Sequence, residues 1–393
     1  MRDATASVTQ DVVIVGAGPV GAALALALRD ADLDLVVVDA RVQGQMPRGD
    51  RSLALSHGAR LILERLGVWT PLNAAPGAVT AITAIDISQA RGFGSVRLDA
   101  SEQGLPALGY VVSYRALQQT FDDALRAAAI DVRFGVEVRA VSGETDGASI
   151  DTEGTSGQTT LKTRLAVVAD GSASMVRGID RRRHDYRQTA VVASVALDHP
   201  HGGVAYERFT SDGPVALLPE RDRYGLVWTQ KPDEAARTLA LSDAAFVNEL
   251  AVHFGSRLRG FTGVRDRRSF PLALERARDT TAPHVVVIGN AAQALHPVAG
   301  QGFNLGLRDA FELAAVIVDS PREDLGSRAM LVRYARRRTR DRRAGIAFTH
   351  GLVHVFGNDQ ALFRVPRGVG MTLLDSIPFA KRAFTHAMLF GMR

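Results

Sequence analysis

Residues 11–39, DVVIVGAGPVGAALALALRDADLDLVVVD, decide the fold that we expect for this chain. A β-branched run leads into a glycine turn with GxGxxG spacing, formed by Gly16, Gly18 and Gly21. An apolar helical stretch follows, and a second apolar run ends in Asp39, 18 residues after the last of these glycines. Strand, glycine turn, helix, strand and acid in this order predict a dinucleotide-binding βαβ unit. The glycines let the backbone approach a pyrophosphate, and the Asp39 carboxylate can accept both hydroxyls of an adenosine ribose.

A signal peptide or a membrane span is the competing interpretation of this segment, because residues 12–28 carry no charge. The run is shorter than the roughly 20 apolar residues that a span needs, and Gly-Ala-Gly-Pro interrupts it. The sequence therefore favours the dinucleotide-binding unit and a cytoplasmic location.

A second glycine motif lies far downstream, in residues 286–309, VVIGNAAQALHPVAGQGFNLGLRD. An apolar strand leads into a loop with Gly300, Gln301 and Gly302, and an amphipathic run begins at about Asn304. The start of a helix leaves backbone N–H groups unpaired beside the positive end of its dipole, which stabilises anions. Glycines add no side chain, so a flat ligand can approach this backbone closely.

Composition limits the remaining classes of protein. With 393 residues, the chain is long enough for about two domains. It has no cysteine, which excludes disulfides, thiolate metal ligands, cysteine nucleophiles and cysteine-linked flavin, and is compatible with a reducing compartment. The histidine spacings match no metal-binding pattern, so we expect no metal site.

Positive charge gathers near the C-terminus. From residue 321 onward there are 14 Lys and Arg against 5 Asp and Glu, a net charge of +9, whereas the whole chain carries +5. The run RYARRRTRDRR at 333–343 lacks a nucleic-acid-binding signature, so we expect no nucleic-acid partner. It is either a solvated helix face or a contact with an anionic membrane or an acidic protein. The apolar tail 352–393 suits an interfacial helix, or a helical cap on the nucleotide-binding domain.

The rest of the chain alternates between helical and strand-like patterns. The expected helices cover residues 53–66, 115–129 and 242–254. Strand-like runs cover residues 78–98, 132–138, 149–152, 159–161 and 165–169, the last leading into Asp170. Further strand-like runs between 189 and 274, interrupted by one helix, predict a separate antiparallel sheet. Residues 284–288 then return to the nucleotide-binding domain, which is therefore discontinuous.

Three motifs together resemble the single-component flavin-dependent aromatic hydroxylases. They are the N-terminal GxGxxG turn, DGSASMVR at 170–177, which fits the family pattern DGxxSxVR, and GNAAQALHPVAGQGFNLG at 289–306. The family's late motif usually begins Gly-Asp, with histidine where this chain has Gln293, and here Asn290 replaces the aspartate. This changed motif, with RSLALS at 51–56 and RGVGMTLLDSIPFAKR at 367–382, is similar to the ubiquinone-biosynthesis branch of 2-polyprenyl-6-methoxyphenol hydroxylases.

The resemblance implies an α/β fold with three parts. A Rossmann-like FAD-binding domain of the p-hydroxybenzoate hydroxylase type would consist of residues 1–75, 105–180 and 280–345. An inserted antiparallel β-sheet domain would bind substrate with residues 76–104 and 181–279. A helical C-terminal region would follow in residues 346–393.

The resemblance also implies FAD as the cofactor and gives roles to residues around it. The pyrophosphate would be held by Gly16, Gly18 and Gly21. Asp39 would bind the adenosine ribose, while Arg51 and Arg115 would contact the phosphate or ribityl region.

Further residues are assigned to the flavin and its electron donor. Asp170 and Arg177 would bridge FAD and the nicotinamide donor, and Asn290 would bind the ribityl chain. The pyrimidine end of the isoalloxazine ring would face the helix start at Asn304 and the loop residues Gly300, Gln301 and Gly302.

His296 is the residue of the second glycine motif with a useful proton near pH 7. Because Pro297 follows it, His296 is expected in extended or polyproline geometry. It is either a catalytic or substrate-orienting group, or a histidine that packs and braces the loop.

By resemblance, the enzyme uses NADH or NADPH and molecular oxygen to hydroxylate the ring of a polyprenyl phenol through a flavin hydroperoxide. Only one dinucleotide fingerprint is present, so the nicotinamide donor would bind transiently. The alternatives are another aromatic substrate or ring position, a flavin-dependent dehydrogenase or reductase, and a non-catalytic flavin-binding or assembly protein. Because a polyprenyl phenol is very apolar, the resemblance also implies peripheral contact of the enzyme with the inner face of the membrane or with a ubiquinone-biosynthesis protein complex.

Overall fold

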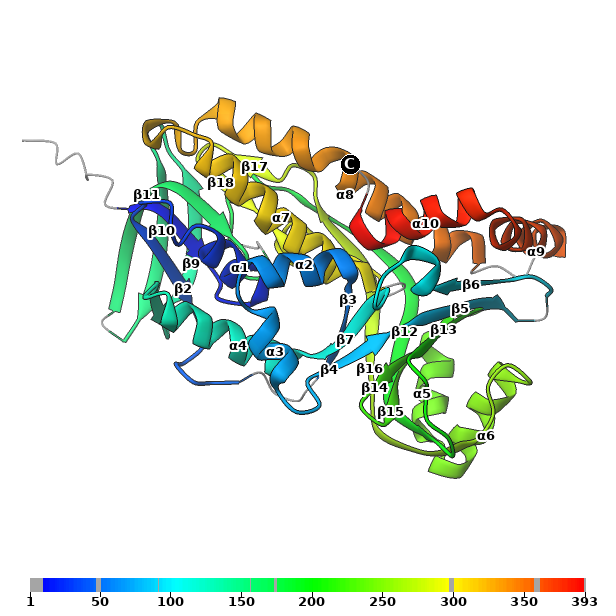
Figure 1. The fold of residues 1–393 in the computed structure, drawn as a ribbon. Coiled ribbons are helices and arrows are strands. Elements are labelled where there is room, and N and C mark those ends of the chain that lie inside the picture. Colours follow the sequence, from blue (N-terminus) through cyan, green and yellow to red (C-terminus); the bar gives the residue numbers. More distant parts are fainter. Residues whose placement is uncertain are drawn as a thin grey trace, which may run out of the picture.

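The computed structural model describes residues 10–46, 51–90, 92–155, 157–172, 175–296, 300–356 and 361–391. These residues form three sheets, helices that cover them, and a helical C-terminal region (Figure 1).

The first sheet is mainly parallel and has the strand order β17-β18-β11-β1-β2-β8. These strands are β1 (Gln10–Val15), β2 (Leu35–Asp39), β8 (Asp131–Phe134), β11 (Gly157–Val168), β17 (Thr281–Ala282) and β18 (Val285–Val287). An antiparallel extension continues from β11 through β10 (Ala148–Gly154) to β9 (Glu137–Gly143). Pairing of β1 with β11, and of β11 with β18, joins segments that are far apart in the sequence.

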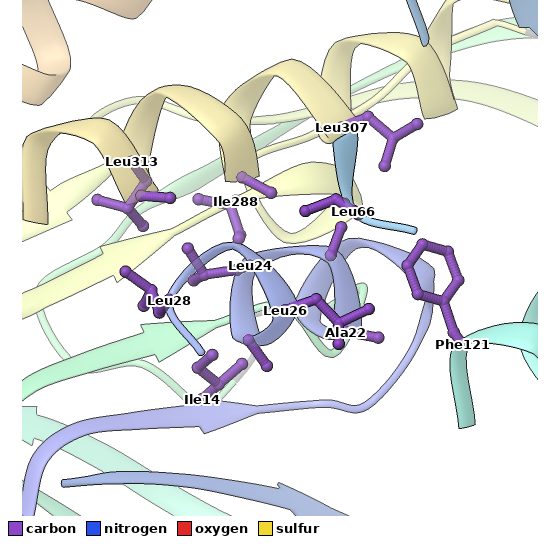
Figure 2. Close-up of a cluster of buried hydrophobic side chains, with 14 of the residues drawn as sticks. Ile14, Ala22, Leu24, Leu26, Leu28, Leu66, Phe121, Ile288, Leu307 and Leu313 are labelled. Carbon is purple, nitrogen blue, oxygen red and sulfur yellow. The ribbon is translucent and has the colours of Figure 1, made fainter. Parts of the chain in front are cut away.

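Both faces of this sheet are buried. Its helices are α1 (Pro19–Ala27), α4 (Tyr114–Ala127) and α7 (Gln301–Val318). Ile14 of β1 packs with Leu24 of α1 and Leu313 of α7, as Figure 2 shows. Its neighbour Val13 belongs to the core on the other face, with Ile150 of β10. Burial on two faces explains why residues 12–15 are apolar without a polar alternation.

The second sheet has the strand order β19-β16-β12-β15-β14-β13-β5-β6. Its strands are β5 (Ala84–Gln89), β6 (Ser95–Asp99), β12 (Arg181–Leu197), β13 (Val204–Thr210), β14 (Gly213–Glu220), β15 (Arg223–Gln230), β16 (Phe261–Ala277) and β19 (Gln293–Ala294). The strands between 189 and 274 pair antiparallel, as expected, and one further pair, β13 with β5, runs parallel. Two helices, α5 (Pro232–Ala240) and α6 (Asp243–Phe254), interrupt these strands where one was expected.

A small third sheet lies between the other two, with the order β3-β7-β4. It contains β3 (Ser52–Ser56), β4 (Val79–Ile82) and β7 (Gly109–Ser113), and two helices follow β3, α2 (His57–Arg65) and α3 (Trp69–Ala74). The expected helix at 53–66 is therefore wrong in its first turn. Residues 53–56 pair with β7, and the Ser56 hydroxyl accepts the Ala59 N–H as the cap of α2.

The C-terminal region is helical, as expected. It consists of α8 (Arg328–Phe356), α9 (Ala361–Ser376) and α10 (Pro378–Phe390), and α9 packs on β6 (Figure 1). Single 3-10 turns occur as η1 (Ser101–Gln103), η2 (Gly289–Ala291) and η4 (Arg322–Asp324). No helix in the described part of the chain is both long and apolar enough to span a bilayer.

The basic run 333–343 lies in α8, and its central arginine is not solvated. Arg338 is only 5% exposed, and its Nε donates to Oδ1 of Asp309 on α7 at 2.7 Å. Arg338 Nη1 donates to Asp341 at 2.7 Å. By contrast, the side chain of Arg337 is 40% exposed and meets Asp319 at 3.4 Å. Part of the run therefore ties α8 to the first sheet's helices, and only the rest can form a charged surface.

The change Arg338→Leu should destabilise the protein by about 3 kcal/mol, because it leaves the buried Asp309 carboxylate without its counter-charge. Urea unfolding followed by circular dichroism measures this. Arg337→Leu is the matched control and should change the unfolding free energy by less than about 1 kcal/mol, as is usual for an exposed ion pair. Equal losses in both variants would contradict a structural role for the buried pair.

Candidate functional site

A cavity of about 1210 Å³ extends from the glycine turns of the first sheet to the second sheet and the C-terminal helices. A typical small-molecule site has roughly 300–1,000 Å³. The cavity is therefore large enough for a dinucleotide and a second ligand together.

One end of the cavity lies at the carboxyl edge of the first sheet. Gly16 follows β1, Asp39 ends β2, Asp170 follows β11, and both Gly289 and Asn290 follow β18. All five residues line the cavity. Because β1, β2, β11 and β18 are parallel, their carboxyl ends meet at one edge, which is where open α/β sheets bind ligands.

Each of the three positions in the first turn is a glycine for a different structural reason. Gly16 has φ +103°, and a Cβ there would lie 2.9 Å from the Ala169 carbonyl carbon. A Cβ on Gly21 would overlap the Gly16 carbonyl oxygen. Gly18 has an ordinary φ and lines the cavity, and its Cβ would meet no atom of the described residues within 4 Å. A side chain at Gly18 would therefore occupy space left for a ligand, whereas Gly16 and Gly21 serve the turn itself.

Asp39 braces this turn. Its Oδ2 accepts the Ala17 N–H at 2.6 Å, and its Oδ1 accepts the Arg41 N–H at 2.8 Å. Arg41 and Gln118 both donate to the Ala17 carbonyl, at 3.1 and 2.9 Å, and both line the cavity. Neither was expected from the sequence, although Arg41 follows the acid by two residues and Gln118 lies in α4.

The second glycine motif forms the N-terminus of α7. The helix begins at Gln301, so the expected start at Asn304 is three residues too late. Gly300 caps it with φ +59°, and its Cβ would lie 2.8 Å from the Ala54 Cβ. The Asn304 side chain donates to the carbonyls of Ala54 and Gly300 and accepts the N–H of Ser56. Asn304 therefore fastens the loop to β3, and the cavity is lined by Gly300, Gln301, Gly302, Phe303 and Asn304.

The predicted arginines are only partly brought together. Arg51 lines the cavity, with its guanidinium 4.2 Å from the centre of the Tyr114 ring. Arg115 is exposed on α4 and is not among the lining residues. Arg177 is also exposed and lines a separate small cleft with Gly143 and Asp279. Of the central motif, Ala173 and Ser174 lie outside the described residues.

Two residues that depart from the family pattern have distinct places. Gln293 is fully buried, and its Nε2 donates to Oδ2 of Asp309 at 2.7 Å, which also accepts the Gly289 N–H. Asn290 is exposed in the cavity wall. Gln293 therefore holds the loop after β18, and Asn290 faces the space where a ligand would lie.

The other end of the cavity is apolar. Strands of the second sheet supply Ile85, Ile87, Val96, Ala205, Phe209, Ala216, Leu218 and Val227. The helices α8, α9 and α10 supply Phe348, Leu352, Met371, Leu374, Phe384, Met388 and Leu389. The C-terminal helices are thus a wall of the cavity, a contribution that the sequence did not predict.

His296 lies in this wall and is 1% exposed. Its ring centre is 5.3 Å from that of Tyr186, and the two rings are almost perpendicular. Burial lowers the pKa of His296 to about 4, so the ring is neutral at pH 7, and its catalytic or substrate-orienting role stays a prediction. Pro297, on which its expected backbone geometry depends, lies outside the described residues.

Comparisons with known proteins agree with this geometry. A family model described as "FAD binding domain" matches residues 9–349. Ubiquinone hydroxylase UbiL of Rhodospirillum rubrum is 34% identical over 393 residues, which cover 96% of this chain and 89% of the relative. The 3-demethoxyubiquinol 3-hydroxylase of Escherichia coli is 31% identical, with 95% of this chain and 96% of the relative covered. Among solved structures, p-nitrophenol 4-monooxygenase PnpA of Pseudomonas putida shares the fold, with a TM-score of 0.77, 19% identity, and coverage of 98% and 99%.

Proposed function

The chain belongs to the FAD binding domain family, and we propose that it is an FAD-dependent monooxygenase that hydroxylates the ring of a polyprenyl phenol in ubiquinone biosynthesis. The observation that carries the proposal is the continuity of the cavity. It joins a dinucleotide-binding edge to an apolar wall formed by the second sheet and the C-terminal helices. A flavin at the first end would therefore lie beside an aromatic, lipid-like substrate at the second.

The residues at the carboxyl edge fit FAD. The open space over Gly18 suits a pyrophosphate, and Asp39 suits the adenosine ribose. The N-terminal residues of α7 offer backbone N–H groups and the positive end of a helix dipole to the flavin ring. When bound and reduced, FAD supplies the activation of molecular oxygen for insertion into the ring.

The protein itself binds and orients the substrate and excludes water from the space around it. The apolar wall excludes water from the space beside the flavin site and accepts the prenyl chain. The electron donor is NADH or NADPH, bound transiently, since the sequence has one dinucleotide fingerprint. Arg115 and Arg177 lie outside the cavity, so their contacts with FAD or the donor remain predictions from the sequence.

Product analysis tests the function. Protein loaded with FAD, supplied with NADH or NADPH and a short-chain 2-prenylphenol, should form a hydroxylated product in an oxygen-dependent reaction. The measurement is mass spectrometry with oxygen-18 gas, which should place one labelled atom in the product. Reduction of dyes without labelled product would instead indicate a dehydrogenase or reductase of the same fold.

The change Gly18→Val should abolish FAD binding while leaving the unfolding midpoint of the flavin-free protein unchanged. A Cβ there meets no atom within 4 Å in the described part of the chain, but the valine side chain fills the space assigned to the pyrophosphate. Flavin absorbance per protein and a thermal melt measure the two effects. The contrasting variant Gly21→Val should lower the melting temperature itself, because its Cβ overlaps the Gly16 carbonyl. Full flavin content in Gly18→Val would refute the assignment.

Peripheral contact with a membrane surface belongs to the same proposal. The inner sides of α9 and α10 line the cavity, and their outer sides carry exposed apolar residues. These are Val365, Val369, Leu373 and Phe379, with exposed Ile377 between the two helices and exposed Phe93 adjoining Gly368 of α9. Arg336, Arg337 and Arg340 of α8 are exposed cations, each worth about 1 kcal/mol near anionic lipid. A lipid-resident substrate could then enter between helices that touch both the membrane and the cavity.

The double variant Leu373→Gln and Phe379→Gln should lose co-sedimentation with vesicles of anionic phospholipid. Its turnover of a short-chain, water-soluble prenylphenol should persist, because neither side chain lines the cavity. The control is Val252→Gln with Val318→Gln, two equally exposed apolar residues on α6 and α7. If both double variants bind vesicles as the unmodified protein does, the contact lies elsewhere or is made with a protein.

A further inference from the structure

A carboxyl group faces the apolar end of the cavity. On β13, alternate residues Ala205, Glu207 and Phe209 line the cavity. Glu207 is paired in register with Ile87 of β5 on one side and Ala216 of β14 on the other. Among the described residues of the second sheet, Glu207 is the one acidic or basic side chain that lines this space.

The described residues around Glu207 do not compensate its charge. Its Oε1 is buried and has no hydrogen-bond partner among the described residues. Burial raises the pKa of Glu207 to about 7, and no charge among the described residues contributes to this shift. Glu207 as a residue is half-buried, but a buried carboxyl oxygen without a partner is costly for a fold, and in a cavity wall it indicates a group reserved for a ligand.

Other ionisable groups are placed differently. Asp86 and Arg208 lie on the opposite face of the strands β5 and β13, by the alternation of the sheet. The elements packed on this wall contribute Arg367 from α9 and His296, while Tyr206 adjoins Glu207 on β13. The dinucleotide end holds the remaining cavity-lining ionisable groups, Asp39, Arg41, Arg51, Tyr114, Glu137 and Asp170. Because the pKa of His296 is about 4 and that of Glu207 about 7, Glu207 is the better matched base at neutral pH.

We propose that Glu207 binds the phenolic hydroxyl of the substrate and accepts its proton as the ring is attacked. The proposal rests on the proposed hydroxylase function and names the group that orients its phenol. The phenol O–H bond breaks, an O–H bond forms on the carboxylate, and the electron pair stays on the phenol oxygen. That oxygen then raises the electron density of the ring carbons ortho and para to it, which an electrophilic oxygen attacks.

Steady-state kinetics with a short-chain 2-prenylphenol test whether Glu207 acts as the base. Glu207→Gln keeps the shape but cannot take a proton, so kcat should fall by about 10²- to 10⁴-fold, the usual contribution of a general base. FAD content and the anaerobic rate of flavin reduction should be unchanged. The unmodified enzyme should lose kcat/KM as the pH falls below about 7, because only the carboxylate accepts a proton, and this acid limb should vanish in the variant. Glu144→Gln, the same change at an exposed ion pair outside the cavity, should behave as unmodified.

A binding measurement without turnover distinguishes a failure of this inference from a failure of the proposed function. The change in flavin absorbance on titration reports the Kd of the phenol and of its O-methyl ether, which has no proton to donate. The unmodified protein should prefer the phenol at least tenfold, and Glu207→Leu should remove the preference. Retention of that preference, or an unchanged kcat and acid limb in Glu207→Gln, would overturn the role of Glu207. Absence of any hydroxylated product from the unmodified enzyme, with the phenol preference intact, would instead overturn the hydroxylase function.

Discussion

The parallel pairing of β1 with β2 and β11, and of β11 with β18, is the constraint on which the site depends. It places four loops from residues 16 to 290 at one edge of the sheet. The loops after β1 and β11 approach each other so closely that a Cβ on Gly16 would lie 2.9 Å from the backbone after β11. Such pairing is stable only when both faces of the sheet are buried, which explains the two separate apolar cores around β1.

A buried polar network holds the second glycine motif against this edge. Asp309 of α7 accepts hydrogen bonds from Gly289 and Gln293 through Oδ2 and pairs with Arg338 of α8 through Oδ1. One carboxylate thereby connects the loop after β18, the helix that faces the ligand space, and the first C-terminal helix. The basic run of α8 is thus partly an internal structural element, and the glutamine that departs from the family pattern has a defined partner.

Burial acts in opposite directions on His296 and Glu207, two of the ionisable groups of the apolar wall. It lowers the pKa of His296 and raises that of Glu207, because burial disfavours the charged form of each group, the imidazolium and the carboxylate. At neutral pH the histidine is neutral, and the glutamate lies near its midpoint. The protonation of these two groups is therefore decided by burial as much as by the residue types themselves.

Local sequence determined the βαβ unit, the helical tail and the family resemblance, because GxGxxG spacing and apolar runs act over neighbouring residues. Tertiary structure alone decided that residues 53–56 form a strand, since they pair with β7 more than 50 positions away. It also decided that Arg338 is buried while Arg337 is exposed, and that Glu207 faces the cavity. Arg177 belongs to a family motif, yet it lines the separate small cleft and not the main cavity. These outcomes depend on which distant segments pack together, and that information is absent from the spacing of residues along the chain.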